Sequence, residues 1–227
     1  MKKLVSPRGP SGLRARKAAH TRLSLLDALV RGLRTRGFDE ISVRELCHEA
    51  GVSEPTFFNY FGSKREILVF FVQLWSVEMQ HRIQISAGCA FEALLRLFTL
   101  TAEAAVQTPR LMYEIISHQV RTGALGNSTT PSPAELALRF AELPGAAERS
   151  PASVGSIVGA TVHQAVCNGE LPRSTNLFAA QSLIVSLFFG APAAHPDARD
   201  IALAYSLGLH TIWRGLGGEF ASKEERA

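Results

Sequence analysis

The stretch from Ser42 to Lys64, SVRELCHEAGVSEPTFFNYFGSK, gathers the side chains of this chain that are best suited to contact a polyanion. Ser42 and Glu45 have the serine-x-x-glutamate spacing of a capping box, in which each side chain satisfies a backbone N–H at a helix start. Gly51 stands where this first short helix must stop, and Ser53 suits the cap of a second one. Two short helices across a glycine turn are typical of a helix-turn-helix, whose second helix enters the major groove of DNA.

The same stretch resembles the DNA-binding head of the tetracycline-repressor (TetR) family of bacterial transcription regulators. The resemblance covers about residues 19 to 79, and Glu66 comes one place late because Arg65 intervenes. The matching positions are Ser42, Ala50, Gly51-Val52-Ser53, Thr56, the aromatic pair Phe57-Phe58, Tyr60-Phe61 and Ser63-Lys64. It implies an N-terminal three-helix head that carries the helix-turn-helix and a C-terminal helical body that binds a ligand and dimerises.

The DNA contacts implied by this resemblance divide into two sets. Glu54 can accept a hydrogen bond from cytosine N4, and Asn59 can pair with adenine. Phe57 and Phe61 are four residues apart on one helix face, so they are expected in the core. The residues expected to contact phosphates are Ser42, Thr56, Tyr60 and Lys64, and the residues expected to face bases are Arg44, Ser53, Glu54, Pro55, Phe58 and Asn59.

Charge is distributed unevenly along the chain, because residues 1–65 carry a net charge of +7 and residues 66–227 a net charge of −3. Such asymmetry places the attraction for a polyanion in the N-terminal part. The expected organisation is a disordered basic arm over residues 1–14, a DNA-binding domain over 15–79 with its motif at 42–61, and a ligand-binding and dimerisation domain over 80–227.

Apolar residues recur at helical spacing, and no run shows sustained strand alternation, so the fold is predicted to be all-α. The last two helices are expected over Leu177–Phe189 and Ala198–Gly215, with a loop from Gly190 to Asp197 between them. Both are apolar on more than one side and need cover on several sides. By the resemblance they form a four-helix interface in a homodimer, and interior helices of a monomer are the alternative.

The resemblance also implies a small-molecule pocket in the body, whose occupancy weakens DNA binding. The candidate lining residues are mostly apolar with a few polar anchors, as in most ligand cavities. They are Trp75, Phe91, Phe98, Met112, Ile115, Gln119, His163, Gln164, Cys167 and Phe178. For each of them, packing in an ordinary core is the alternative.

Several other classes of protein are not indicated. Cys47, Cys89 and Cys167 are odd in number and far apart, so no disulfide framework or metal site is predicted, and a redox-sensing thiol is the alternative to core packing. No cofactor or catalytic motif is found, so an enzyme is not expected. The N-terminus lacks an apolar export segment, and the apolar run Leu183–Ala194 is short for a bilayer, so the protein is expected in the cytoplasm without a membrane partner.

The sequence therefore predicts a sequence-specific DNA-binding transcription regulator. Its expected partners are a double-stranded DNA operator, a second copy of the chain and an unidentified small-molecule effector. The favoured form is a repressor that the effector releases from a pseudo-palindromic operator. An effector-independent or architectural DNA-binding protein, or an activator, is the alternative.

Overall fold

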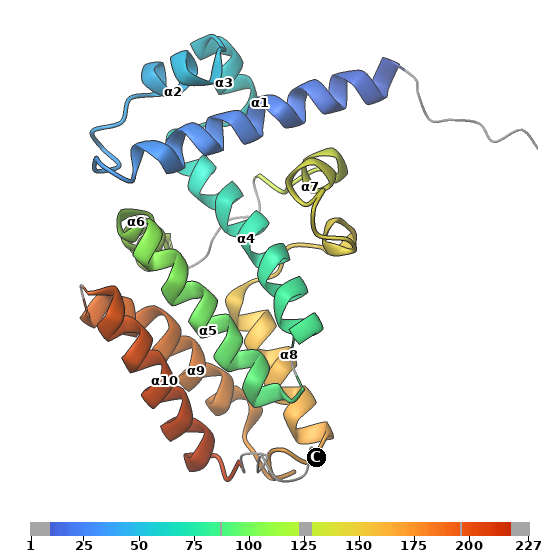
Figure 1. Cartoon of the computed structure of the whole chain (residues 1–227), viewed down its shortest axis with the longest axis vertical. Helices are drawn as coiled ribbons and strands as arrows, with labels where there is room; N and C mark the ends of the chain where they lie inside the picture. The colour runs from blue at the N-terminus through green and yellow to red at the C-terminus, as the bar shows by residue number, and fades with distance from the viewer. Residues whose placement is uncertain (1–9, 87, 123–128, 196, 219–227) are drawn as a thin grey trace, which may run out of the picture. The chain divides into compact units, whose positions relative to one another are not determined.

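The structure is a computed structural model that describes residues 10–86, 88–122, 129–195 and 197–218. These residues are helical and contain no strand, as the periodicity predicts (Figure 1). The elements are α1 (Pro10–Gly32), α2 (Val43–Ala50), α3 (Glu54–Tyr60), α4 (Lys64–Ser86), α5 (Ala90–Gln107), α6 (Pro109–Thr122), α7 (Pro133–Arg139), the 3-10 turn η1 (Ala146–Glu148), α8 (Val154–Cys167), α9 (Leu177–Ala194) and α10 (Ala198–Gly215).

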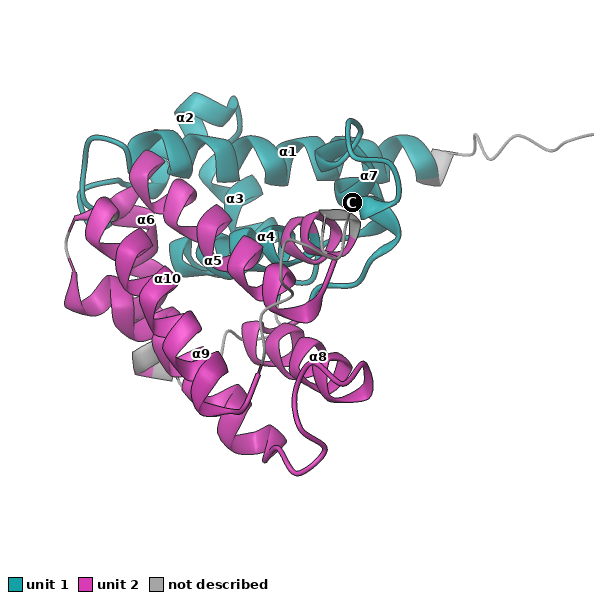
Figure 2. Ribbon diagram, turned by 60° about the horizontal axis from the view of Figure 1, so that its bottom comes forward, with its two compact units in different colours: residues 1–77, 126–151 teal, residues 78–125, 152–227 magenta. Residues whose placement is uncertain are grey.

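The helices form two compact units, which Figure 2 shows in different colours. The first unit contains Met1–Val77 and Gly126–Pro151, and the second contains Glu78–Leu125 and Ala152–Ala227. The structure thus differs from the division expected from the sequence, which gave all of residues 80–227 to one body. The α7 segment, defined here as residues 129–151, belongs to the first unit, where α7 packs against α1.

The first helix is longer at its N-terminus than the sequence suggested. It begins at Pro10, so residues 10–14 are helical where a disordered arm was expected, and residues 1–9 of that arm lie outside the described residues. The helix is anchored by its C-terminal half, where Leu25, Leu26 and Leu29 are fully buried. Burial of this leucine face holds α1 against the rest of the first unit.

The expected loop at Gly190 is instead helical, because α9 continues through Pro192 to Ala194. A proline inside a helix removes the N–H that would bond the carbonyl four residues earlier. Here that carbonyl belongs to Phe188, and it accepts a hydrogen bond of 2.7 Å from the buried hydroxyl of Tyr205 on α10. The tertiary partner replaces the lost bond, so the helix continues. Burial also raises the pKa of Tyr205, which keeps its hydroxyl a donor.

The apolar character of α9 is greater than the short run in the sequence indicated. Its 18 residues have a mean hydropathy of 1.7, and by length and composition alone the helix could cross a membrane. A helix that protein covers on several sides has the same composition. Within the second unit α9 packs against α6, α8 and α10, yet only 28% of its residues are buried.

The turn after α8 caps the first helix of the second unit. Gly169 adopts φ +77°, a left-handed conformation that ends α8. Glu170 follows, and its carboxylate oxygens accept bonds of 2.8 and 3.0 Å from the Ala90 N–H at the start of α5. Cys89 occupies the N-cap position of α5 without a side-chain bond of its own, so Glu170 performs the capping.

We expect the substitution Glu170→Ala to lower the free energy of unfolding of the second unit by about 1–2 kcal/mol, because α5 loses its cap. Urea unfolding followed by the fluorescence of the buried Trp213, in a Trp75→Phe background, measures this change. Glu103→Ala on the exposed face of α5 is the matched control. Equal midpoints for the two variants would contradict the capping role.

Candidate nucleic-acid interface

The two short helices of the motif begin and end as the sequence predicts. Ser42 Oγ accepts from the Glu45 N–H at 3.2 Å, and the Glu45 carboxylate accepts from the Ser42 N–H at 2.7 Å, which completes the capping box of α2. Gly51 ends α2 in the left-handed region, with φ 68°. Ser53 Oγ accepts from the Thr56 N–H at 3.3 Å and caps α3. The predicted helix-turn-helix is confirmed at each of these positions.

A charged contact reinforces the start of α2. Arg36 Nη1 donates to Glu45 Oε1 at 2.7 Å, while Ser42 donates to the other carboxylate oxygen. The Arg36 bond, followed by the two Ser42 bonds, lowers the pKa of Glu45 to about 2. Because the folded-state pKa is lowered, these bonds stabilise the fold above the ordinary pKa of a carboxyl group and are lost as the pH falls toward 2. The cap is therefore fully formed at neutral pH.

Aromatic packing fixes the rotation of α3. Phe57 and Phe61 are fully buried, with their ring centroids 6.0 Å apart, and Phe61 lies 5.7 Å from Phe70 of α4. Phe58 is 54% exposed, although its ring packs edge-on against Phe57 with the centroids 5.2 Å apart. The structure thus confirms that Phe57 and Phe61 lie in the core. One face of α3 is anchored, and the other is presented to solvent.

The predicted DNA residues lie on or beside this presented surface. The exposed ones are Ser42, Arg44, Ser53, Glu54, Pro55, Phe58 and Asn59, and the half-buried ones are Thr56, Tyr60 and Lys64. The hydroxyls of Ser53 and Thr56 are 2.9 Å apart and bond each other. Arg44 and Asn59 are exposed polar side chains of the kind that reaches base edges in the major groove.

Lys64 has a structural role that the sequence did not indicate. Its ammonium group donates to the carbonyls of Phe38 and Ile41 at 2.5 and 2.6 Å, and it lies 4.2 Å from the centre of the Phe38 ring. These carbonyls belong to the turn between α1 and α2, in which the Phe38 carbonyl also accepts a bond of 3.3 Å from the Ile41 N–H. The lysine therefore holds this turn against α4, in addition to the phosphate contact expected of it.

The structure places the ten candidate ligand residues on five helices, α4, α5, α6, α8 and α9. Phe91 is core, with its ring 4.9 Å from His210 and 5.3 Å from Trp213. Phe178 is 81% exposed on α9. The other placements are Trp75, half-buried on α4; Met112, Ile115 and Gln119, half-buried on α6; His163, Gln164 and Cys167, exposed on α8; and Phe98, buried on α5.

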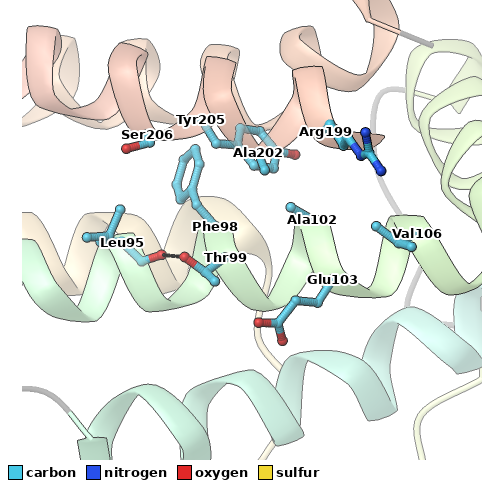
Figure 3. A pocket seen from close by; sticks show the side chains of 10 residues that line it. All are labelled: Leu95, Phe98, Thr99, Ala102, Glu103, Val106, Arg199, Ala202, Tyr205 and Ser206. Atoms are coloured by element: carbon cyan, nitrogen blue, oxygen red, sulfur yellow. Dashed lines mark hydrogen bonds between the residues drawn. The ribbon is translucent and has the colours of Figure 1, made fainter. Parts of the chain in front are cut away.

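Of these residues, Phe98 lines a cavity of about 210 Å³ between α5 and α10 (Figure 3). Phe98 and Tyr205 form its floor with ring centroids 4.7 Å apart. The remaining lining residues are Leu95, Thr99, Ala102, Glu103, Val106, Arg199, Ala202 and Ser206. The cavity is smaller than the roughly 300–1,000 Å³ of most small-molecule sites, so it suits at most a compact apolar group.

Among the side chains that the structure describes, no group of three or more His, Cys, Asp or Glu residues is placed to hold a metal ion. Cys47 is buried, Cys89 is half-buried, and Cys167 is exposed with its Sγ 3.8 Å from Nδ1 of His163. The exposed surface of α2 and α3 is therefore the site best supported by the geometry.

Comparison with known proteins agrees with this geometry. Residues 25–69 match the family described as bacterial regulatory proteins, tetR family. Among solved structures, the chain resembles FadR of Thermus thermophilus, described as a TetR family transcriptional repressor in complex with lauroyl-CoA. The identity is 21%, the match covers 88% of this chain and 97% of that chain, and the TM-score is 0.61.

Two further structures share the fold. GusR of Salmonella enterica is 15% identical, with 87% of this chain and 95% of that chain covered and a TM-score of 0.57. A TetR transcriptional regulator of Rhodococcus sp. RHA1 is 17% identical, with 91% and 99% covered and a TM-score of 0.52. None of the curated proteins compared with the chain matches it.

We expect Lys64→Met to lower the free energy of unfolding of the first unit by about 1–3 kcal/mol, because two loop carbonyls lose a charged donor. Urea unfolding followed by Trp75 fluorescence, in a Trp213→Phe background, measures the loss. Lys17→Met, on the exposed face of α1, removes the same charge without these bonds and is the control. A Lys64→Met protein as stable as the control would show that the turn does not depend on this ammonium group.

Proposed function

We propose that the chain is a member of the TetR family of bacterial regulatory proteins and a sequence-specific DNA-binding transcription regulator, on the match of residues 25–69 and the shared fold. In its favoured form it is a repressor that a small-molecule effector releases from a pseudo-palindromic operator. The observation that carries the proposal is the orientation of α3. Burial of Phe57 leaves Glu54, Phe58 and Asn59 exposed on a capped helix that follows a glycine turn.

The proposed contacts follow from the chemistry of the exposed surface. Asn59 pairs with adenine, Glu54 accepts from cytosine N4, and Arg44 reaches guanine. Phe58 and Pro55 are apolar and suit the methyl group of thymine. Ser42, Thr56, Tyr60 and Lys64 hold the sugar-phosphate backbone and set the register of α3, while Ser53 stays among the base-facing residues.

We propose that α9 and α10 join two copies of the chain. The exposed large apolar side chains of these helices, with their exposed fractions, are Leu177 (39%), Phe178 (81%), Leu183 (52%), Leu203 (57%) and Leu207 (60%). A surface of this kind is expected to be covered by another protein. In a two-fold dimer each copy presents the same patch, and the two reading helices address half-sites about 34–36 Å apart.

The proposed effector is supported by a solved structure of the same fold and by the thermodynamic coupling of two binding sites. The structure of Thermus thermophilus FadR contains lauroyl-CoA, so a protein of this fold binds a small molecule. A ligand changes DNA affinity only by binding two conformations differently, typically by about 1–3 kcal/mol. A regulator of this kind acts in the cytoplasm, where bacterial DNA lies, and no catalytic role is proposed.

Selection of bound fragments from genomic DNA with the purified protein tests the proposed function. The expected result is an enriched pseudo-palindromic sequence, whose binding is lost with one or more compounds of a metabolite panel. Broad binding without an enriched sequence would favour an architectural DNA-binding protein. Transcription in vitro from a promoter that contains the enriched site distinguishes repression from activation.

We expect Asn59→Ala to weaken operator binding by about 1–3 kcal/mol, because one bidentate base contact is lost. Preference at the contacted base pair should relax, while affinity for an unrelated duplex stays the same. Fluorescence anisotropy with the operator and with variants at each position measures both effects. Glu142→Ala, at an exposed position of the α7 segment, is the control. Unchanged discrimination at every position would remove Asn59 from the base contacts.

We expect Leu207→Glu to convert the dimer into a monomer, because two carboxylates would be buried in the proposed interface. Sedimentation equilibrium measures the mass. Operator affinity should also fall, because a monomer contacts one half-site where a dimer contacts two. Leu13→Glu changes a similarly exposed leucine on α1 and should leave the mass unchanged. A Leu207→Glu protein that remains dimeric would place the interface elsewhere.

A further inference from the structure

An ion pair between the half-buried Arg22 and the buried Glu135 fastens the α7 segment to α1 within the first unit. Arg22 Nη1 donates to the two carboxylate oxygens of Glu135 at 2.9 and 3.1 Å, and Nη2 donates to the Thr129 carbonyl at 3.3 Å. The side chains are 13% and 2% exposed. Burial lowers the pKa of Arg22, and the Glu135 carboxylate opposes this shift. An arginine remains charged under these conditions.

Glu135 is itself held in place by α7. Its carboxylate accepts from the Ser132 N–H at 2.6 Å, and Ser132 Oγ accepts from the Glu135 N–H, so the two residues form the capping box of this helix. A side chain that caps its own helix has little freedom to move. The position of α7 therefore fixes the position of the carboxylate that Arg22 meets.

The other side of the Arg22 guanidinium faces the aromatic cluster beneath α3. Its central carbon lies 4.1 Å from the centre of the Phe70 ring and 5.0 Å from the centre of the Phe61 ring. Phe61 is the C-cap residue of α3 and packs against Phe57. A continuous set of contacts thus leads from Glu135 through Arg22 to the buried face of the helix that is proposed to read DNA.

Stability alone is a weak reason for such a pair. Removing two charges from water costs several kcal/mol each, and apolar residues of the same volume are often as stable or more stable. A buried pair does impose one geometry, since both partners must meet with correct distances and angles. The sequence also places the α7 segment between α6 and α8 of the second unit, so the pair fastens a returning section of chain to the reading head.

We propose that Arg22 and Glu135 are positioning residues for DNA recognition, and that the α7 segment is a functional part of the reading head. The pair sets the position of α3 through Phe61, so that the exposed residues of this helix meet the bases in register. The inference rests on the proposed function, because it assigns the pair a role in operator recognition.

The test compares Glu135→Gln with the wild-type protein. Glutamine keeps the shape and the helix cap, but it removes the carboxylate that Arg22 bonds and leaves the weaker electrostatic interaction with Glu66. We expect operator affinity to fall about tenfold, which corresponds to about 1.4 kcal/mol and to the loss of one base contact. Affinity for an unrelated duplex and the salt dependence of binding should stay the same, because phosphate contacts are retained. A loss of stability alone would not change the ratio of specific to unspecific affinity in a folded protein.

Asp27→Asn provides the matched control. Asp27 bonds Arg139 at 3.3 Å and so joins the same two helices, but this pair is exposed and does not reach the aromatic cluster. We expect its operator affinity to stay within twofold of the wild type, as for most exposed pairs. A folded Glu135→Gln protein that binds the operator as tightly as the control would overturn the proposal. Failure of the wild-type protein to enrich any operator would instead overturn the proposed function.

A second measurement uses the wild-type protein and does not depend on the folding of a variant. Coupling between two sites is reciprocal, so DNA that fixes α3 must also stabilise the Arg22–Glu135 contact. We expect operator DNA to slow amide hydrogen exchange in α7, and an unrelated duplex to slow it less. Equal exchange in α7 with and without the operator would contradict the positioning role.

Discussion

The burial of Phe57 and Phe61 against Phe70 determines which side of α3 faces outward. A helix of seven residues has too little intrinsic stability to keep one orientation, so tertiary packing of its apolar face must supply it. The caps at Ser42 and Ser53 fix where the helices begin, and the phenylalanines fix their rotation. Asn59 and Phe58 are exposed as a result of this packing, and the proposed recognition chemistry depends on it.

Charge counting overstates the number of basic side chains available to DNA. Arg31 bonds Glu49, Arg36 bonds Glu45, and the half-buried Arg22 bonds Glu135. Lys64 donates to two loop carbonyls. The net charge of the N-terminal residues still attracts a polyanion within about a Debye length. Formation of an ion pair does not change the net charge, because both partners stay charged. The short-range contacts must come from other donors, including the backbone and the hydroxyls near the helix starts.

The features predictable from the sequence are those set by neighbours along the chain. The capping box of α2, the left-handed Gly51 and the shared face of Phe57 and Phe61 each follow from residues within four positions. The missed features need a distant partner. Pro192 stays in a helix because Tyr205 bonds the freed carbonyl, and the α7 segment joins the first unit because Glu135 meets Arg22 across more than a hundred residues. The predicted pocket residues were chosen by composition, which cannot distinguish a buried ring such as Phe91 from an exposed one such as Phe178.

Contacts between residues far apart in the sequence also bear on how an effector would change the binding of DNA. The chain passes between the two units within α4, between Leu125 and Gly126, and between Pro151 and Ala152. The second and third passages bound the α7 segment, which Glu135 fastens to α1 under the aromatic cluster. A ligand in the second unit alters DNA affinity only if one arrangement of these connections binds it better than another. Within the first unit, a displacement of α7 would act on the Arg22–Glu135 pair and, through the contact of Arg22 with Phe61, on the packing of α3, so the proposed coupling would use contacts inside that unit.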